Sequence, residues 1–281
     1  VDIDPRSFNL DPVAVEDAIT EQTKAILPVH LFGGVAAMTQ IMEIADAHDL
    51  KVLEDCAQSF GARYEGACVG CDGEHCDNTR RAEYTGKVTG AIGQAGAYSF
   101  FPTKNLGAYG DGGLIATDDD EVAETARMLR KHGGANKYLN QMLGYNSRLD
   151  AIQAAILRVK LPYVDEYNLA RREIAKRYNE YLGDVEGIVT PEIPEGHVVH
   201  QYTIRVKGGK RDALADALGD REIASKVYYP VPCHRLPVYD MDIELPESER
   251  AAAEVLSLPI WPQAGAEVQE RVADAIREVM R

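Results

Sequence analysis

The sequence predicts an α/β protein with a larger N-terminal part built on a mostly parallel sheet and a smaller C-terminal α+β part. Apolar runs at residues 23–33 and 51–54 flank a helical pattern over residues 38–48, which is the spacing of a βαβ unit. A third apolar run, residues 95–101, is typical of a buried strand. In the C-terminal part, short strand patterns alternate with short helical ones, which predicts a separate small domain.

Length and charge narrow the class of protein. The chain has 281 residues, enough for two domains with a sizeable core. Its 45 Asp and Glu against 30 Lys and Arg give a net charge of -15, which disfavours nucleic acid or an anionic membrane as a partner because either would require a basic face. No apolar stretch reaches the length of a membrane span, and the first residues do not form a signal peptide. We therefore expect a cytoplasmic protein.

Lys104 lies at the end of the strand predicted at residues 95–101, directly after a break at Pro102 and Thr103. Residues 107–113 carry four glycines, which suit tight backbone passages. A lysine held there can lose solvation, which lowers its pKa and makes it an amine nucleophile toward a carbonyl. The alternative is a surface-loop lysine with a solvated ammonium.

Asp55 ends the apolar run that begins at Leu50. A carboxylate at the end of a parallel strand points into the crevice where open α/β sheets bind ligands. There it can hold a protonated ring nitrogen; a helix cap or a solvated strand end is the alternative. A lysine that forms an imine, together with an acid that keeps a pyridinium charged, is the minimum equipment for pyridoxal phosphate chemistry.

Several ordered motifs carry a resemblance to a known family. They are residues 54–58 (EDCAQ), 99–107 (SFFPTKNLG), 110–113 (GDGG), 144–155 (GYNSRLDAIQAA) and 228–234 (YYPVPCH). Together they resemble the sugar aminotransferases of the DegT/DnrJ/EryC1/StrS family, and the resemblance runs nearly end to end. It implies the aspartate-aminotransferase-like fold of fold type I enzymes, with pyridoxal 5'-phosphate as the cofactor.

The resemblance also implies roles for individual residues. Lys104 would form the imine with the cofactor, Asp55 would pair with the pyridine nitrogen, and Gln58 would contact the ring hydroxyl. Ser99 would bind the phosphate. Asn146 would reach the phosphate of the neighbouring subunit's cofactor, which implies a homodimer with a shared active site. Related dehydratases have histidine in place of the lysine, so Lys104 favours transamination.

The substrate side of the site is predicted less sharply. Arg148 could bind a phosphate or carboxylate with its forked guanidinium, or form a salt bridge within the interface. Tyr228, Tyr229 and His234 lie in a Pro-rich loop that corresponds to one closing over the substrate in the family; packing of the tyrosines in the core is the alternative. The implied reaction moves an amino group from glutamate to a keto sugar, with a nucleotide-linked sugar expected. The acceptor could instead be a cyclitol or aromatic-precursor ketone. A further alternative is that the chain is a catalytically impaired homologue with a regulatory role.

We expect a large cofactor-binding domain over residues 1–146, connecting helices over 147–182 with a break at Pro162, and a small domain over 183–281. Family members have an N-terminal portion with a phosphate-binding Gly-Thr/Ser turn and an aromatic residue that stacks on the cofactor. Neither feature precedes Asp55 in this chain. The resemblance therefore predicts an N-terminally incomplete large domain.

Residues 67–92 depart from the family as an insertion rich in cysteine. Cys68, Cys71, His75 and Cys76 could supply four soft ligands for zinc. The loop between the ligand pairs is short for a structural zinc site. Free thiols on a surface loop of a protein in a reducing compartment are the alternative, in which case the insertion holds no metal.

The periodic patterns of the remaining chain predict its other elements in order. Asp118, Asp119 and Asp120 are expected to cap a helix that continues to residue 131. The other expected elements are a strand at 114–117, helices at 147–159 and 163–182, a strand at 198–206, a helix at 211–218, a strand at 224–229, and helices at 247–256 and 266–280.

Overall fold

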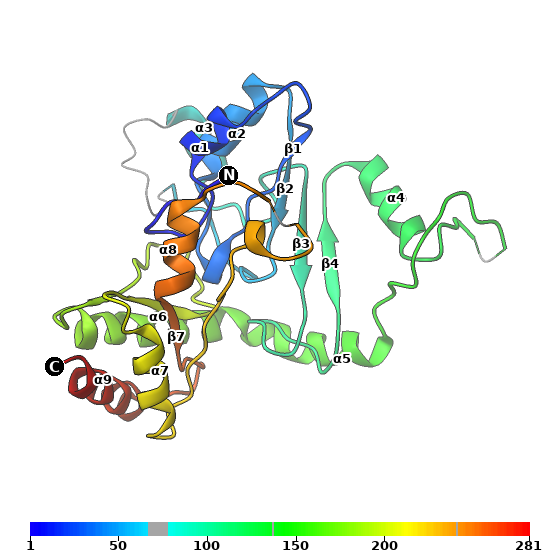
Figure 1. Cartoon of the computed structure of the whole chain (residues 1–281). Coiled ribbons are helices and arrows are strands. Elements are labelled where there is room, and N and C mark those ends of the chain that lie inside the picture. The colour runs from blue at the N-terminus through cyan, green and yellow to red at the C-terminus, as the bar shows by residue number, and fades with distance from the viewer. Residues whose placement is uncertain (67–77, 137, 240) are drawn as a thin grey trace.

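The computed structural model describes residues 1–66, 78–136, 138–239 and 241–281. Its larger sheet has the strand order β1-β2-β3-β4 (Figure 1), with β1 at Ala25–Ile26, β2 at Lys51–Asp55, β3 at Ala95–Ser99 and β4 at Gly113–Ala116. β1, β2 and β3 run parallel, and β4 pairs with β3 in the antiparallel sense. The predicted mostly parallel sheet is therefore present.

Helix α2, Met38–Ala47, is the crossover between β1 and β2 and confirms the predicted βαβ unit. Its apolar side packs on the sheet, and Met38, Ile41 and Val52 are fully buried in one cluster. Two short helices, α1 at Pro12–Asp17 and α3 at Asn78–Tyr84, complete this part. The sequence did not predict α3.

The strand predicted over residues 23–33 was too long. Only β1 forms a ladder; Val29 adds an isolated bridge to Asp55, and Leu31–Gly33 is a 3-10 turn. Pro28 has no N–H to donate to a ladder, and the positive φ of Phe32 (57°) turns the chain away from the sheet.

The C-terminal part is organised around a three-stranded antiparallel sheet of order β5-β6-β7. Its strands are Ile188–Val189, Tyr202–Val206 and Val255–Leu258, and its helices are α7 at Arg211–Gly219, α8 at Pro246–Glu254 and α9 at Ala266–Met280. Tyr178 of the long helix α6, Val164–Leu182, stacks on Tyr202 with 4.7 Å between ring centroids. None of the helices in the described part of the chain is both long and apolar enough to cross a bilayer.

Two predictions for the C-terminal part were wrong. Residues 224–229 form no strand, only an isolated bridge between Lys226 and Ser257. The helix predicted over 247–256 ends at Glu254, and the unpredicted strand β7 follows at once. All four residues of β7 are buried, so the strand lacks the alternation by which a half-buried strand is found.

The middle of the chain connects the two sheets. Helix α4, Asp120–Leu129, is capped as predicted, because the Asp119 carboxylate accepts from the amides of Glu121 (2.9 Å) and Val122 (3.1 Å). Helix α5, Ala151–Lys160, passes through a 3-10 turn at Leu161–Tyr163 into α6, which matches the predicted break at Pro162. The segment between α4 and α5, called the arm (residues 130–149), projects away from both sheets (Figure 1).

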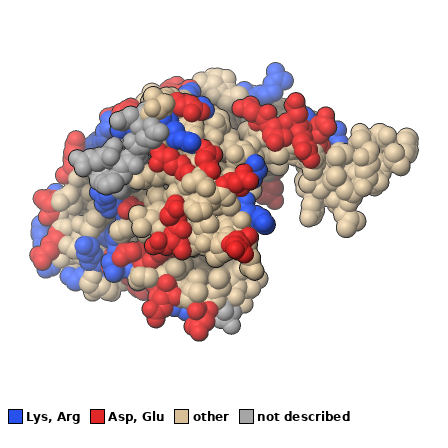
Figure 2. Space-filling view, turned by 90° about the horizontal axis from the view of Figure 1, so that it is seen from above, with Lys and Arg blue, Asp and Glu red and all other residues tan. Residues whose placement is uncertain are grey.

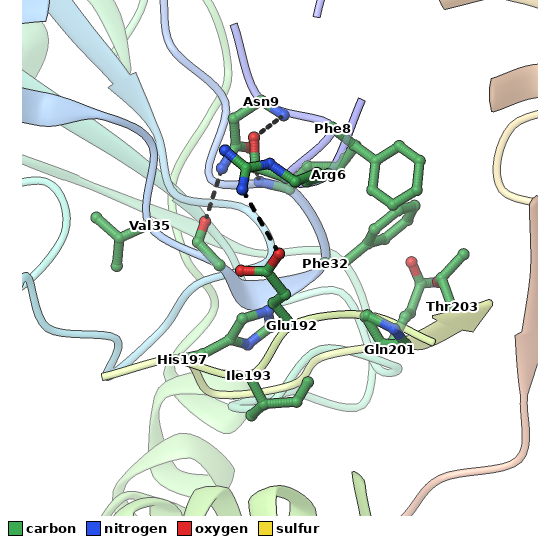
Figure 3. Close-up of a pocket in the computed structure, with 14 residues that line it drawn as sticks. Arg6, Phe8, Asn9, Phe32, Val35, Glu192, Ile193, His197, Gln201 and Thr203 are labelled. Carbon is green, nitrogen blue, oxygen red and sulfur yellow. Dashed lines mark hydrogen bonds and ion pairs between the residues drawn. The ribbon is translucent and has the colours of Figure 1, made fainter. Parts of the chain in front are cut away.

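The N-terminal segment packs between the two sheets. The ring of Phe8 meets that of Phe32 edge-on at 5.6 Å, and the Asn9 amide donates to the carbonyl of Gly34 at 3.4 Å. These residues and His197 surround a hollow of about 20 Å³ (Figure 3). Such a volume holds about one water, so the cofactor site lies elsewhere.

Candidate active site

The loop that carries Lys104 is fixed by its own backbone. The Lys104 amide donates to the carbonyl of Phe101 at 2.9 Å, and the Lys160 ammonium donates to the carbonyl of Gly107 at 2.7 Å. A Cβ at Gly107 would lie 2.4 Å from the carbonyl oxygen of Pro102, so glycine is required for this close approach. The loop therefore holds Lys104 in one place at the end of β3.

The structure brings Lys104 and Asp55 together. Burial lowers the pKa of the Lys104 ammonium, and the nearby Asp55 carboxylate opposes that shift without cancelling it. One oxygen of Asp55 accepts from the amide of Ala57 at 2.9 Å. The lowered pKa leaves a larger share of Lys104 as the free, nucleophilic amine near neutral pH than an exposed lysine would have.

Asp55 and Ser99 open onto one hollow. In the parallel register, Asp55 pairs with Ala97, so the side chains of Asp55, Ala97 and Ser99 lie on the same face of the sheet. All three line a hollow of about 730 Å³, a size typical of small-molecule sites. The Ser99 hydroxyl accepts from the amide of Phe101 at 3.2 Å, which leaves its hydrogen free to donate to an anion.

Gln58 bridges the two parts of the chain at this site. Its amide oxygen accepts from the amide of Phe32 at 2.7 Å, and its nitrogen donates to the hydroxyl of Tyr229 at 3.1 Å. The second hydrogen on the nitrogen can still donate to a ligand oxygen. The structure therefore places Tyr229 next to a predicted cofactor residue, while the Tyr228 ring packs edge-on against Tyr229 at 5.6 Å.

His234 is paired with helix α8 in the structure. Its side chain is 4% exposed, and its Nε2 lies 3.0 Å from a carboxylate oxygen of Glu249 on α8. Arg235 donates to the same oxygen at 2.7 Å. These contacts make His234 part of the packing between its loop and α8.

Asn146 and Arg148 lie together at the base of the arm. The Asn146 side-chain oxygen accepts from Arg148 Nε at 3.1 Å and from its terminal nitrogen at 2.9 Å. Both residues are exposed, and within the described residues no hydrogen bond connects them to the loop of Lys104.

The predicted zinc ligands Cys68, Cys71, His75 and Cys76 fall outside the described residues. Within residues 1–66, 78–136, 138–239 and 241–281, His30, Glu54 and Cys56 bring their donor atoms within 4.8 Å of one another. The carboxylate already accepts four hydrogen bonds, from His30 Nε2 and from the amides of Gly90, Ile92 and Gly93. The cluster is therefore a saturated structural network.

Sequence reasoning missed two residues beside the lysine. The Asn105 side-chain oxygen lies 2.9 Å from His200 Nδ1, and His200 is close enough to Lys104 for that ammonium to lower its pKa. Asn105 directly follows the lysine, so its position was a usable signal. His200 stands 95 residues further on (200 minus 105) in an alternating strand pattern that gives no sign of the site.

These donors fit pyridoxal phosphate. An amine suits its aldehyde, an acid suits its ring nitrogen, and a hydroxyl suits its phosphate. A partly buried lysine close to an acid at the carboxyl ends of a mostly parallel sheet is the arrangement expected of a fold type I pyridoxal phosphate enzyme.

Comparisons with known proteins identify the family. The model of the DegT/DnrJ/EryC1/StrS aminotransferase family matches residues 1–277. A pleiotropic regulatory protein of Geobacillus stearothermophilus is 49% identical over 100% of this chain and 72% of that protein. A UDP-N-acetyl-3-dehydro-alpha-D-glucosamine 3-aminotransferase of Acidithiobacillus ferrooxidans is 42% identical over 100% of this chain and 71% of that protein.

The fold agrees with a solved member. The crystal structure of DesV from S. venezuelae, in complex with a ketimine intermediate, matches with a TM-score of 0.86 at 40% identity, over 99% of this chain and 71% of that one. The chain therefore belongs to the DegT/DnrJ/EryC1/StrS aminotransferase family, which confirms the predicted fold. The aminotransferases of this family use pyridoxal phosphate.

Proposed function

We propose that the chain transfers an amino group from glutamate to a keto group on a nucleotide-linked sugar. The observation that carries this proposal is the pairing of a partly buried Lys104 with Asp55 at the carboxyl end of β2. The 42% identical relative named as a 3-aminotransferase of a UDP-linked dehydro sugar supports the substrate class.

Lys104, Asp55, Gln58 and Ser99 have different roles in the proposed reaction. When bound, the cofactor supplies an electron sink for the carbanion that forms as the amino donor loses its Cα proton. Lys104 would hold the cofactor through its amine, and the same amine, when free, would carry that proton. Asp55 would keep the ring nitrogen protonated, Gln58 would donate to the ring hydroxyl, and Ser99 would donate to the phosphate.

The lysine assignment is tested by absorbance. Lys104→Ala is expected to remove the cofactor's absorbance near the visible edge and all turnover, because both depend on the imine that this amine forms. Lys176→Ala is the control, since Lys176 is exposed and pairs with Glu173 on the same helix. Retention of both signals in the Lys104 variant contradicts the assignment.

Donor and acceptor are tested in two half-reactions. Glutamate should convert the absorbance of the bound cofactor to that of pyridoxamine phosphate, with release of 2-oxoglutarate. The converted protein should then aminate a nucleotide-linked keto sugar faster than a cyclitol ketone or an aromatic-precursor ketone. Preference for either of the latter ketones, measured by mass of the product, contradicts the proposed acceptor.

A homodimer with shared active sites would explain why the arm exposes apolar side chains. Tyr138, Leu139, Leu143 and Tyr145 are exposed along it, and Leu143 is 95% exposed. Figure 2 shows the arm as a projection with few charged side chains on the face in view, next to a cluster of acidic side chains. A second copy of the chain covers this apolar surface in our proposal and receives Asn146 and Arg148 at its own cofactor.

Mixing two inactive variants tests the shared site. Lys104→Ala and Asn146→Ala, dissociated and reassociated together, should regain about a quarter of wild-type activity if each site takes one residue from each chain. Mixing Lys104→Ala with Asp55→Ala should not, because both residues come from the same chain in our proposal. Equal activity in the two mixtures contradicts a shared site.

A regulatory role is the second candidate. The observation that favours it is the 49% identity to a protein named as a pleiotropic regulatory protein. A binder without catalysis would keep the absorbance of the lysine-bound cofactor but show no conversion with glutamate. The first half-reaction therefore separates the two candidates.

A further inference from the structure

Asn105 is the most completely bonded side chain beside the lysine. Its oxygen lies 2.9 Å from His200 Nδ1, and its nitrogen donates to the side-chain oxygen of Asn168 at 2.7 Å and to the carbonyl of Val198 at 3.2 Å. A backbone carbonyl only accepts, so the orientation of the Asn105 amide is fixed. Both ends of the amide are therefore in use.

The three bonds join three parts of the chain. Asn105 follows Lys104, Asn168 lies on α6, and Val198 and His200 lead into β6. Asn168 continues the network by donating to the carbonyl of Phe60 at 3.1 Å. The position of the lysine loop is thus tied both to α6 and to the C-terminal sheet.

The orientation of Asn105 also sets the form of His200. Because the Asn105 oxygen faces Nδ1, that nitrogen carries the hydrogen, and the neutral ring keeps Nε2 as an acceptor. His200 is 7% exposed, and the charged groups that face it are Lys104 from the loop and Arg171 from α6. Burial and these two cations lower the pKa of His200 to about 3.

We propose that Asn105 is a positioning residue that holds His200 in one tautomer beside Lys104 without favouring its protonation, so that the ring adds no positive charge next to the reacting amine. The inference rests on the proposed role of Lys104. An imidazolium next to the amine would repel the positive charge that Lys104 carries when it binds the cofactor or returns from moving a proton. A neutral asparagine, unlike an aspartate, gives the imidazole an acceptor without stabilising that charge.

The test uses a substitution that makes protonation of His200 more favourable. Asn105→Asp places a carboxylate against Nδ1, which favours the imidazolium. In the protein loaded with pyridoxal phosphate, the visible absorbance should then show an additional ionisation at about pH 5–7, the range in which histidine titrates. The wild type should lack it, and Asn105→Asp combined with His200→Asn should lose it.

Asn179→Asp is the matched control. The Asn179 oxygen accepts from the Tyr202 hydroxyl at 2.7 Å and its nitrogen donates to the carbonyl of Pro191 at 2.9 Å, away from the lysine. This control should lower thermal stability without adding an ionisation. An Asn105→Asp spectrum with the same pH dependence as the control overturns the proposal and leaves a merely structural role.

If Asn105→Asp does not fold, a second pair of variants tests the proposal. His200→Leu removes the ring's hydrogen bonds, and His200→Asn keeps a donor near the position of Nδ1. His200→Leu should slow the glutamate half-reaction at least about tenfold with little change in KM, and His200→Asn should restore most of the rate. Equal rates in both variants overturn the proposal. A wild type without visible absorbance refutes the lysine assignment itself and the inference with it.

Discussion

Glu54→Gln hardly changes the shape of the side chain but should strongly lower the stability of the fold. Glu54 is 1% exposed, and its two oxygens accept from His30 Nε2 (2.9 Å) and from the amides of Gly90 (2.7 Å), Ile92 (2.8 Å) and Gly93 (2.7 Å). In Glu54→Gln, one oxygen becomes an NH2 group, so two of these buried donors face another donor and lose their acceptor.

The size of the effect follows from the number of lost bonds. Each buried donor left without an acceptor costs about 1–3 kcal/mol, so Glu54→Gln should lower the free energy of unfolding by about 4 kcal/mol. For a chain of this size, that lowers the melting temperature by about 10 °C. Thermal unfolding followed by circular dichroism at pH 7.5 measures it.

The pH dependence gives a second readout. Burial raises the pKa of Glu54, but hydrogen bonds from His30 and from the amides of Gly90 and Gly93 lower it by more, so the net shift is downward. A lowered pKa stabilises the folded state above the ordinary value of 4.5, and that contribution is lost as the pH falls through the lower folded value. The gap between wild type and Glu54→Gln should therefore narrow below pH 4.5.

Glu249→Gln is the control. Glu249 also accepts from a histidine, His234 at 3.0 Å, and from Arg235, yet its side chain is 39% exposed. Water can replace the lost acceptor there, so the melting temperature should move much less. A Glu54→Gln protein that melts within about 2 °C of the wild type, or no lower than Glu249→Gln, refutes the reasoning.

Two further variants test close packing and acid stability. A Cβ at Gly96 would lie 2.3 Å from the Cα of Gly90, so Gly96→Ala should lower the free energy of unfolding by about 1–3 kcal/mol or more in urea, whereas Gly219→Ala, with nothing within 4 Å, should be nearly neutral. Burial, helped by Arg172, lowers the pKa of His197 from 6.5 to about 3, so the unfolded chain binds the extra proton and stability falls as the pH drops below 6.5. His197 alone should cost about 2 kcal/mol between pH 7 and pH 5; if His197→Gln keeps the same dependence, that assignment is wrong.

The central pair of the site was predictable because it depends on local rules. Asp55 ends strand β2 and Lys104 follows strand β3, and parallel neighbouring strands bring their carboxyl ends to one edge. The cap at Asp119 and the break at Pro162 were also predictable, since each acts within a few residues of its own position.

Contacts between distant segments were not predictable in the same way. His200 reaches Asn105 only after α6 has carried the chain past the lysine loop. Strand β7 is buried on both faces, so its sequence VLSL lacks the alternation of a half-buried strand and was predicted as the end of helix α8. The sequence placed His234 in a substrate loop, and only the fold reveals its pairing with Glu249.

The neighbouring acids on β2 show how the fold assigns different tasks to similar side chains. Glu54 and Asp55 point to opposite faces because successive strand residues alternate. Glu54 meets four donors and has no capacity left for a ligand. Asp55 accepts from one backbone donor, the amide of Ala57, and so keeps acceptor capacity for a ligand. Of the two carboxylates, only Asp55 can therefore hold a ring nitrogen, while Glu54 keeps the turn behind it in place.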